Sequence, residues 1–343
     1  MPKSPELPEL KIADLSFWQP PPAHRVLKPA LADSNGCPLW FGFSDHGDDA
    51  RSRAISAIFI THAALPSPPP NRSGIISSSM IIEKKSAAQI ALMRKAGLVV
   101  WEAHQAAASL VKAGTTTAEI DAVVEKVIRD HHAEPLFKGH KVQGAPPFPA
   151  CACVSVNEEI VHGIPGPRQL KDGDIVSVDI GVRYQGWCGD AAVTWPVGEI
   201  SAEAKKLLEI CEGTLRLAIR KMKANIVWNK VARVMESNVK NAGFAVVEDL
   251  CGHGIGHDMW ESPQVPNYFS PFSGDFKLQA GMVVAIEPMV AVGTKALRIL
   301  DDHWTYVTAD ASLAAHFEHT IAITEDGVTV LTCGPDGQGW AMG

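Results

Sequence analysis

The chain has 343 residues, enough for one large domain or two small ones, and its composition is ordinary for a globular protein. A formal net charge of −7 argues against a broad nucleic-acid-binding surface and leaves small molecules or peptides as ligands. Seven cysteines without a CxxC pair favour free thiols in a reducing, cytoplasmic setting, and no run approaches the ~18 apolar residues of a membrane span.

Residues 1–80 differ in composition from the rest of the chain. They hold about half of the prolines, including the runs at 20–22 and 68–70, and show no sustained apolar periodicity. We therefore predict a proline-rich N-terminal extension, largely disordered, followed by a catalytic domain over residues 81–343. The alternative is that Met80 is the natural start of the protein.

The first predicted elements after this extension are two helices, each opened by a capping box. Ser86 with Gln89 begins a helix that should run to about Lys112, and Thr116 with Glu119 begins another that should run to about residue 131. A short strand at 151–156 and a loop through residues 162–165 follow.

Residues 173–197 predict a β-hairpin that carries two aspartates. The β-branched residues of 175–182 favour a strand, and Gln185-Gly186 is a turn signal. This turn places Asp179 and Asp190 roughly opposite one another, where Cβ atoms lie ~5 Å apart. Two ionised carboxylates on buried strands repel each other unless a proton or a cation lies between them. A divalent metal site and two solvated aspartates on an edge strand both remain open from the hairpin alone.

The second part of the chain repeats the order of helices and strands. Ser201 caps a predicted helix to about Lys223, and a further helix is expected over 227–241. Strands are predicted at 246–250, 281–286 and 317–324. The repeated order predicts an α+β fold of two similar halves, 86–198 and 201–325, with antiparallel strands in the middle and helices outside.

Five candidate metal ligands lie within or next to these apolar strands: Asp179, Asp190, His253, Glu287 and Glu318. A structural salt bridge would be the better explanation for any one of them, because a carboxylate in an apolar strand needs a partner. The sequence offers no comparable set of arginine or lysine partners for all of them. Four carboxylates and one imidazole would suit two divalent ions that share bridging oxygens ~3.5–4 Å apart.

Several ordered motifs of the chain resemble type I methionine aminopeptidases, over residues 81 to 332. They are the 155–158 and 161–165 segments, the 173–190 stretch, Gly252–Gly256, Pro263–Val265, Ile286–Met289 and Phe317–Thr320. The resemblance implies the pita-bread fold and the removal of the initiator methionine from new chains, with preference for a small second residue. It also implies nascent chains as substrates, transient contact with the ribosome, a cytoplasmic monomer, and no nucleic-acid or membrane partner.

The same resemblance assigns the five ligands to a dinuclear centre. Asp190 and Glu318 would bridge the two ions, Asp179 would hold one ion, and His253 with Glu287 would hold the other. The ions could be Co, Mn, Fe or Zn, because a carboxylate-rich site with one histidine accepts each of them.

The catalytic roles implied by the resemblance belong to Glu287 and His162. Glu287 would shuttle the proton as general base and then acid, and His162 would contact the scissile amide and stabilise the tetrahedral intermediate. The methionine side chain would bind among aromatic and sulfur-bearing residues, which suit a thioether. The residues expected to line this pocket are Phe148, Cys153, Met259 and Trp304.

The sequence departs from the family pattern at Trp260, where the family has a second active-site histidine that hydrogen-bonds the substrate. An indole can only donate a hydrogen bond and does not titrate near neutral pH. We therefore expect the metal site to assemble while turnover is lowered or substrate choice is shifted. His257 could partly replace the missing imidazole if its loop bends back. The proline-rich 145–149 segment also differs from the family, so the pocket on that side is less well defined.

Two alternatives remain from the sequence. The first is an aminopeptidase P or prolidase of the same fold, although residues 1–80 are too short and proline-rich for the folded N-terminal domain of those enzymes. The second is a non-catalytic pita-bread protein that binds a peptide or the ribosome, which Trp260 alone favours.

Overall fold

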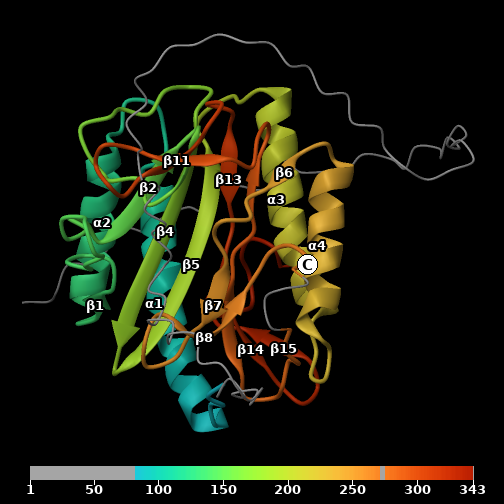
Figure 1. Ribbon diagram of the computed structural model, residues 1–343. Helices are drawn as coiled ribbons and strands as arrows, with labels where there is room; N and C mark the ends of the chain where they lie inside the picture. The colour runs from blue at the N-terminus through green and yellow to red at the C-terminus, as the bar shows by residue number, and fades with distance from the viewer. Residues whose placement is uncertain (1–81, 271–274, 343) are drawn as a thin grey trace, which may run out of the picture. The chain divides into compact units, whose positions relative to one another are not determined.

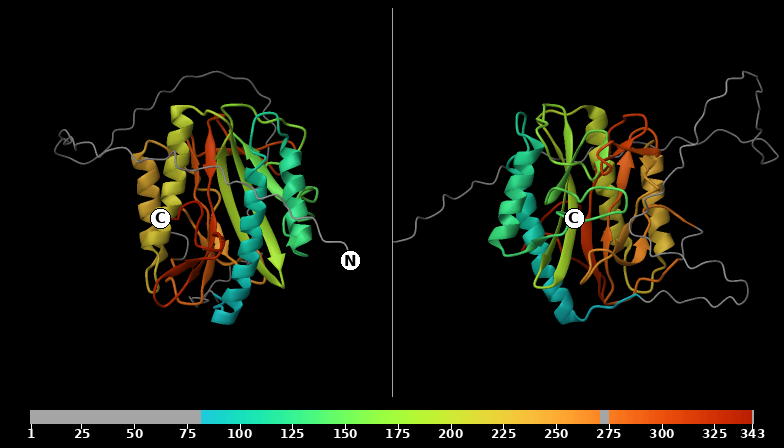
Figure 2. Two further views of the ribbon diagram at one scale, coloured as in Figure 1. Left: turned by 180° about the vertical axis from the view of Figure 1, so that it is seen from behind. Right: turned by 60° about the vertical axis from the view of Figure 1, so that its left-hand side comes forward.

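The computed structural model describes residues 82–270 and 275–342. The extension predicted over residues 1–80 and the alternative start at Met80 lie outside the described residues. In the described part, helix α1 lies behind the hairpin strands in Figure 1 and in front of them in the rear view of Figure 2, and α3 and α4 stand beside the strands at the right of Figure 1. The predicted α+β class is confirmed.

The two N-terminal helices begin where the capping boxes predict. Helices α1 (Ala87–Ala108) and α2 (Thr117–Asp130) both have a complete capping box at their first turn. Helix α1 ends earlier than the predicted Lys112, because Ser109 donates its hydroxyl proton to the Ala106 carbonyl at 2.7 Å and the chain turns there. Buried residues recur along α1 at helical spacing, from Met93 to Ala107, and this face packs on the hairpin strands.

The antiparallel strands expected in the middle of the fold are divided among four sheets. The first contains β1 (Glu134–Pro135), β4 (Ile175–Tyr184), β2 (Ala152–Val156) and β5 (Trp187–Pro196); the second β13 (Ala314–His316), β10 (Met289–Ala291) and β6 (Ala245–Val246). The third contains β11 (Leu297–Ile299), β12 (Tyr306–Thr308) and β3 (Glu159–Val161); the fourth β15 (Val328–Val330), β14 (His319–Ile323), β9 (Val283–Ile286), β7 (Gly252–Gly254) and β8 (Glu261–Val265).

The second half has its own pair of helices, α3 (Ala202–Lys221) and α4 (Trp228–Asn241), close to the predicted ranges. The strand predicted over 246–250 is only the two-residue β6, because its partner β10 has just three residues. The two halves are joined near the centre, where the Glu318 N–H donates to the Ala192 carbonyl at 2.8 Å. No helix of the described residues is long and apolar enough to cross a membrane.

The hairpin strands β4 and β5 are buried on both faces. Val176, Val178, Ile180 and Val182 alternate along β4 and join the main apolar core. The intervening residues, which include Asp179, point to the opposite face. Because helix α1 covers the first face, the second face is where polar side chains of the hairpin can meet the C-terminal half.

Candidate metal centre and substrate pocket

The hairpin brings Asp179 and Asp190 to the same face of the first sheet. Its turn is the predicted Gln185-Gly186 pair, with φ of 52° and 82°, as in a two-residue hairpin turn of type I′. The register pairs Asp179 with Ala192 and pairs Gly181 with Asp190, so the two aspartates are diagonal neighbours and not directly opposed. Diagonal positions still share one face, and both carboxylates are buried.

His253 is presented by the short strand β7 between two glycines. A Cβ at Gly252 would lie 2.3 Å from the Ala285 carbonyl oxygen, and a Cβ at Gly254 would lie 2.2 Å from that of Ser262. Both positions therefore need glycine for β7 to fit between β9 and β8. The His253 Nδ1 contacts the Gly254 carbonyl at 2.9 Å, which makes Nδ1 the protonated nitrogen and leaves Nε2 as an acceptor.

Glu287 and Glu318 lie next to each other at the end of one strand pair. Glu287 directly follows β9 and Glu318 directly precedes β14, and the last pair of this ladder joins Ile286 to His319. The next residues along both strands are the two glutamates, so the ladder ends with both carboxylates at the same place.

These side chains converge on one point. The His253 Nε2 lies 3.7 Å from an Asp190 carboxylate oxygen and 3.7 Å from a Glu287 carboxylate oxygen. One ligand atom from each of Asp190, His253 and Glu318 falls within 4.8 Å of the others. Asp179 lines the same small pocket as Glu287. The structure therefore brings all five predicted ligands together.

The carboxylates are electrostatically costly without a cation. Burial and then repulsion from Asp190 raise the pKa of Asp179 well above its usual range, and burial raises the pKa of Asp190 to about 7. Burial and repulsion by neighbouring carboxylates also raise the pKa of Glu287 and Glu318. Burial lowers the pKa of His253 to about 4, so its imidazole is neutral at pH 7 and free to ligate.

The site fits divalent metal ions. Ligand atoms that each lie about 2.0–2.2 Å from a shared ion can be no more than about 4.4 Å apart, and the 3.7 Å contacts of His253 lie inside this limit. Single oxygens of Asp179, Asp190 and Glu318 are buried without a hydrogen bond, as ligand atoms awaiting a cation would be. Within residues 82–270 and 275–342, the ion pairs of these carboxylates involve histidines and no lysine or arginine.

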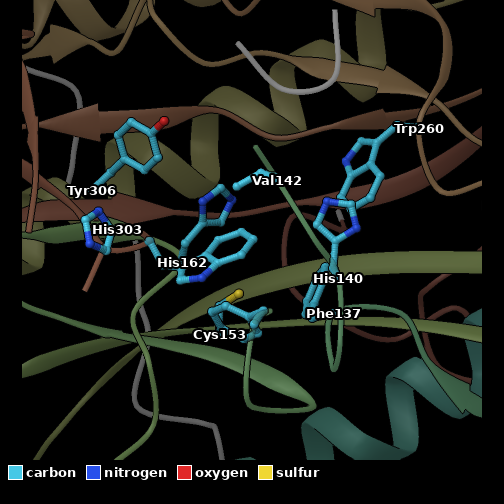
Figure 3. Close-up of a pocket in the computed structure, with 10 residues that line it drawn as sticks. Phe137, His140, Val142, Cys153, His162, Trp260, His303 and Tyr306 are labelled. Atoms are coloured by element: carbon cyan, nitrogen blue, oxygen red, sulfur yellow. The ribbon is translucent and has the colours of Figure 1, made fainter. Parts of the chain in front are cut away.

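An apolar pocket opens beside the metal centre (Figure 3). Of the predicted pocket residues, Phe148, Cys153, His162, Trp260 and Trp304 line it. Met259 is not among the lining residues but packs behind them in the same apolar cluster, 5% exposed. Sequence reasoning missed the other lining residues. Phe137, His140, Val142 and His303 come from loops without a strong pattern, and Tyr306 begins strand β12.

His162 is shared by the apolar pocket and the small pocket at the metal centre. Its ring lies edge-on to Trp304 at 6.4 Å and to Tyr306 at 5.6 Å between centroids. Its φ of 59° lies in the left-handed region, which few residues other than glycine adopt, and such conformations cluster at functional sites. A bond held between the two pockets would therefore lie next to this imidazole.

Comparison with known proteins agrees with this geometry. The model of metallopeptidase family M24 matches residues 91–325. Methionine aminopeptidase 1 of Bacillus subtilis is 45% identical over 248 residues, which are 72% of this chain and 98% of the relative. The methionine aminopeptidase of Clostridium perfringens is 46% identical over 248 residues, 72% of this chain and 97% of the relative. This chain belongs to metallopeptidase family M24.

Solved structures of methionine aminopeptidases and of prolidases both match the chain. The structure of methionine aminopeptidase from Thermotoga maritima matches with a TM-score of 0.70 and 41% identity, over 74% of this chain and 99% of the Thermotoga chain. A prolidase of Pyrococcus horikoshii matches with a TM-score of 0.58 and 23% identity over 73% of this chain and 63% of its own, which shows the common fold alone. The predicted resemblance and the pita-bread fold are confirmed, and membership of M24 supports the binding of divalent metal.

A sixth polar residue of this M24 centre was missed by sequence reasoning. His316 is 1% exposed, and its Nε2 lies 3.8 Å from oxygens of both Glu287 and Glu318. Neither of its ring nitrogens has a hydrogen bond, and burial lowers its pKa to about 3, so it is neutral. Its position two residues before Glu318 was the available signal, since alternate residues of an extended chain share a face.

Trp260 forms part of the pocket wall. Its ring packs on His140 at 4.4 Å between centroids and lies 6.4 Å from the ring of His253. His257 does not take the place of the missing histidine: its Nδ1 contacts the Gly186 carbonyl at 2.8 Å and its ring packs on Trp187. Trp260 therefore lines the apolar pocket and lies next to the metal ligand His253.

Proposed function

We propose that this chain removes the N-terminal methionine from new polypeptides by metal-assisted hydrolysis, with preference for a small second residue. The observation that carries the proposal is the convergence of four carboxylates and one imidazole beside an apolar pocket. Relatives that align over nearly their whole length carry the name methionine aminopeptidase. Family membership supports the metallopeptidase chemistry, and the pocket supports the choice of side chain.

The metal centre in this proposal is dinuclear. Asp179, Asp190, His253, Glu287 and Glu318 would hold two divalent ions, with Asp190 and Glu318 shared between them, and Co, Mn, Fe and Zn would all suit such a donor set. When bound, the ions would lower the pKa of water towards neutrality and polarise a carbonyl group. The buried carboxylates with raised pKa values support this reading, because a cation would relieve the repulsion between them.

The proton transfers are assigned to Glu287 and the amide contact to His162. Glu287 takes a proton from the attacking water and returns it to the leaving amine. His162 donates a hydrogen bond where negative charge develops on the scissile group. The shared position of His162 between the two pockets supports this assignment.

The methionine side chain enters the pocket lined by Phe148, Cys153 and Trp304. Its thioether packs favourably against aromatic edges, and Phe148 and Trp304 are themselves packed edge to face at 5.3 Å. Met259 supports this wall from behind. Trp260 narrows the pocket against His140 and supplies no acceptor for the substrate backbone, so turnover is lower than with a histidine at this position.

The cellular setting follows from the same proposal. The chain acts as a cytoplasmic monomer on nascent chains, with transient contact to the ribosome and no nucleic-acid or membrane partner. The cysteines of the described residues are all free, which fits a reducing compartment. The 1–80 extension precedes a catalytic domain that runs from residue 81 to the end.

A peptidase assay with defined metals tests the proposal. Metal-free protein is loaded with Co²⁺ or Mn²⁺ and given Met-Ala-Ser, Met-Leu-Ser and an X-Pro dipeptide, with Asp190→Asn as the matched inactive variant. Release of methionine from Met-Ala-Ser by the wild type alone supports the proposal. Cleavage only of the X-Pro dipeptide would assign the chain to the prolidase group. Failure of the protein to bind either metal would leave the non-catalytic binder.

A further inference from the structure

The C-terminal segment of the described chain returns to the back of the metal centre. Residues 333–342 lie beyond the part that the M24 model matches, which ends at residue 325. The Arg94 guanidinium donates to the carbonyls of Leu331, Cys333 and Gly334 at 2.7, 2.6 and 2.6 Å, and so fixes the start of this segment to helix α1. The Ala341 N–H donates to a Glu212 carboxylate oxygen at 2.8 Å and fixes its end to helix α3.

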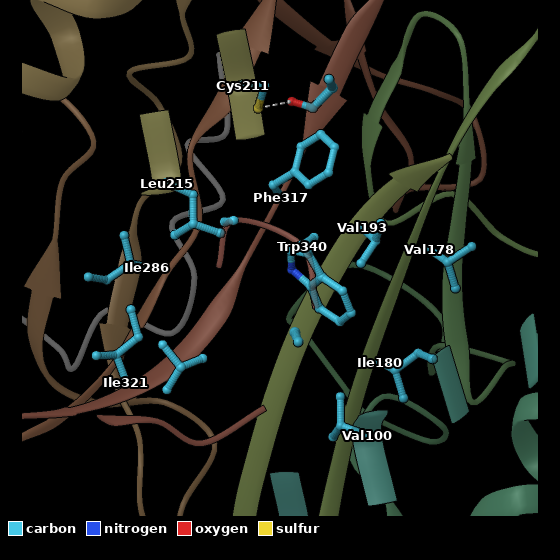
Figure 4. Packing of buried hydrophobic residues seen from close by; sticks show 14 of the residues in the cluster. Val100, Val178, Ile180, Val193, Cys211, Leu215, Ile286, Phe317, Ile321 and Trp340 are labelled. Atoms are coloured by element: carbon cyan, nitrogen blue, oxygen red, sulfur yellow. Dashed lines mark hydrogen bonds between the residues drawn. The ribbon is translucent and has the colours of Figure 1, made fainter. Parts of the chain in front are cut away.

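Trp340 is the residue of this segment that reaches the centre of the fold. Figure 4 shows its side chain between Val100 and Val193 of the first half and Phe317 and Ile321 of the second. The residue is 9% exposed. Trp340 therefore packs between the two halves of the fold. The predicted bridging ligands lie one in each half, Asp190 in the first and Glu318 in the second.

The indole contacts the backbone of a predicted ligand directly. Its Nε1–H donates to the carbonyl of Glu318 at 3.0 Å. Its ring stacks on His319 at 4.6 Å with an interplanar angle of 10°, and the His319 Nε2 contacts the Trp340 carbonyl at 2.9 Å. The indole N–H therefore holds the backbone of Glu318, and the Trp340 carbonyl holds the side chain of the next residue, His319.

The same ring also touches the support of the other bridging ligand. His104 packs edge-on against Trp340 at 5.0 Å, and the His104 Nε2 donates to the carbonyl of Ala191 at 2.9 Å. Ala191 directly follows Asp190 in strand β5. One indole therefore lies between the two backbone positions that set the separation of the bridging carboxylates.

The main chain at Glu318 lies between two strands and is held by single hydrogen bonds. Strand β13 ends at His316 and β14 begins at His319. The Glu318 N–H donates to the Ala192 carbonyl of β5 at 2.8 Å, and the Glu318 carbonyl accepts from the Trp340 indole. Residues that hydrogen-bond to a metal ligand typically change metal affinity by about 10–100-fold when they are removed. A hydrogen bond to the backbone of a ligand also fixes its carboxylate, so its removal should likewise weaken metal binding.

We propose that Trp340 is a positioning residue of the metal centre, through which the C-terminal segment sets the affinity for the divalent ions. The inference rests on the proposed metal site. It assigns a function to residues outside the matched domain: the indole N–H holds the Glu318 carbonyl, and the ring holds His319 and His104, one in each half.

The test compares Trp340→Phe with wild type and with Trp101→Phe. Phenylalanine keeps an aromatic ring against His319 but has no N–H for Glu318. Trp101 stacks on the other side of Trp340 at 5.7 Å, so Trp101→Phe is a matched control that leaves the Glu318 bond in place. The dissociation constant of Co²⁺ is measured by calorimetry and by the visible absorption of the loaded protein, and the Tm is measured without metal.

We expect Trp340→Phe to raise the dissociation constant about tenfold, while Trp101→Phe stays within about twofold of wild type. KM for Met-Ala-Ser at saturating Co²⁺ should stay close to wild type. A lowered Tm in Trp340→Phe with unchanged Co²⁺ affinity would overturn the inference, because the residue would then serve stability alone. If wild type itself binds no metal, the proposed function fails instead.

A second variant covers the case in which Trp340→Phe does not fold. Arg94→Met releases the start of the segment without changing any core residue that touches Glu318. It should weaken Co²⁺ binding in the same direction. Unchanged affinity in a folded Arg94→Met variant would refute the inference on its own.

Discussion

Replacing Trp260 by histidine should raise peptidase activity. The indole now packs on His140, lines the apolar pocket and lies next to His253. A histidine at this position removes the larger ring from the pocket wall and offers a nitrogen that can donate to or accept from the substrate backbone. The metal ligands are unchanged, so the substitution acts on substrate placement alone.

The expected change in kcat/KM follows from one new hydrogen bond, and the expected change in folding stability follows from one lost ring contact. A hydrogen bond formed in the transition state contributes about 0.5–1.5 kcal/mol, and 1.4 kcal/mol corresponds to tenfold in rate. We therefore expect kcat/KM for Met-Ala-Ser to rise by about two- to twelvefold in Trp260→His. The loss of the packing between Trp260 and His140 should cost about 0.5–1.5 kcal/mol of folding stability, so activity rises while the Tm falls.

The assay measures methionine release from Met-Ala-Ser and Met-Leu-Ser with Co²⁺ at saturation. Trp260→Phe is the matched control, since phenylalanine reduces the bulk of the ring without offering a polar atom. Equal activation of Trp260→Phe and Trp260→His would show that bulk alone limits turnover. No gain in kcat/KM for Trp260→His over wild type would refute the reasoning.

Three further predictions concern the metal centre. Chelation should abolish methionine release and Co²⁺ should restore it, whereas Asp190→Asn should stay inactive at any Co²⁺ concentration; recovery of Asp190→Asn would contradict the bridging role. His316→Ala should lower kcat about tenfold and His316→Gln should recover most of it, because a donor at this position, 3.8 Å from the Glu287 carboxylate, would reach hydrogen-bond distance after a small shift of either side chain; equal loss in both variants would argue against an N–H donor. The Tm of metal-free protein should fall from about pH 7.5 to about pH 8.5, while that of Co²⁺-loaded protein should not.

The sign of the pH effect follows from the direction of the pKa shifts. Burial raises the pKa of Asp190 to about 7 and raises that of Glu287 well above its usual range. The folded protein therefore holds protons that the unfolded chain has already lost, and its stability falls as pH rises through the folded-state values. The buried histidines, whose pKa values are lowered, add an opposite slope near pH 6.5, where the unfolded imidazoles are still partly protonated; above about pH 7.5 they are neutral in both states and add little. A metal-free Tm that is flat or rises over this range would contradict the description of the centre.

The sequence predicted those elements whose signals are local. The capping residues Ser86 and Thr116 and the Gln185-Gly186 turn each act within a few residues of the chain, and each is found where expected. Glu287 and Glu318 were found because a carboxylate beside an apolar strand is costly enough to need an explanation. The splitting of the strands into four sheets was missed, because strand pairing depends on contacts between distant residues.

The pocket was predictable only in part for a related physical reason. Its walls come largely from irregular loops, and His140 and His303 carry no periodic pattern that would place them there. His316 was missed because an imidazole in an apolar strand is usually a satisfied core residue, and only the distances to Glu287 and Glu318 show otherwise. The resemblance located Cys153 and Trp304, which composition alone would have left in the core.

The metal ligands lie on paired strands, whereas the residues that depart from the family pattern lie on loops. The ligands come from β4, β5, β7 and the ends of β9 and β14, which the ladders hold in fixed register. Trp260 and the 145–149 segment belong to loops, where a changed side chain need not move the ladder. Substrate choice can therefore change in this chain while the metal centre stays assembled. A non-catalytic binder would have no comparable reason to keep five buried ligands with raised or lowered pKa values, since burying them costs stability unless a cation is bound.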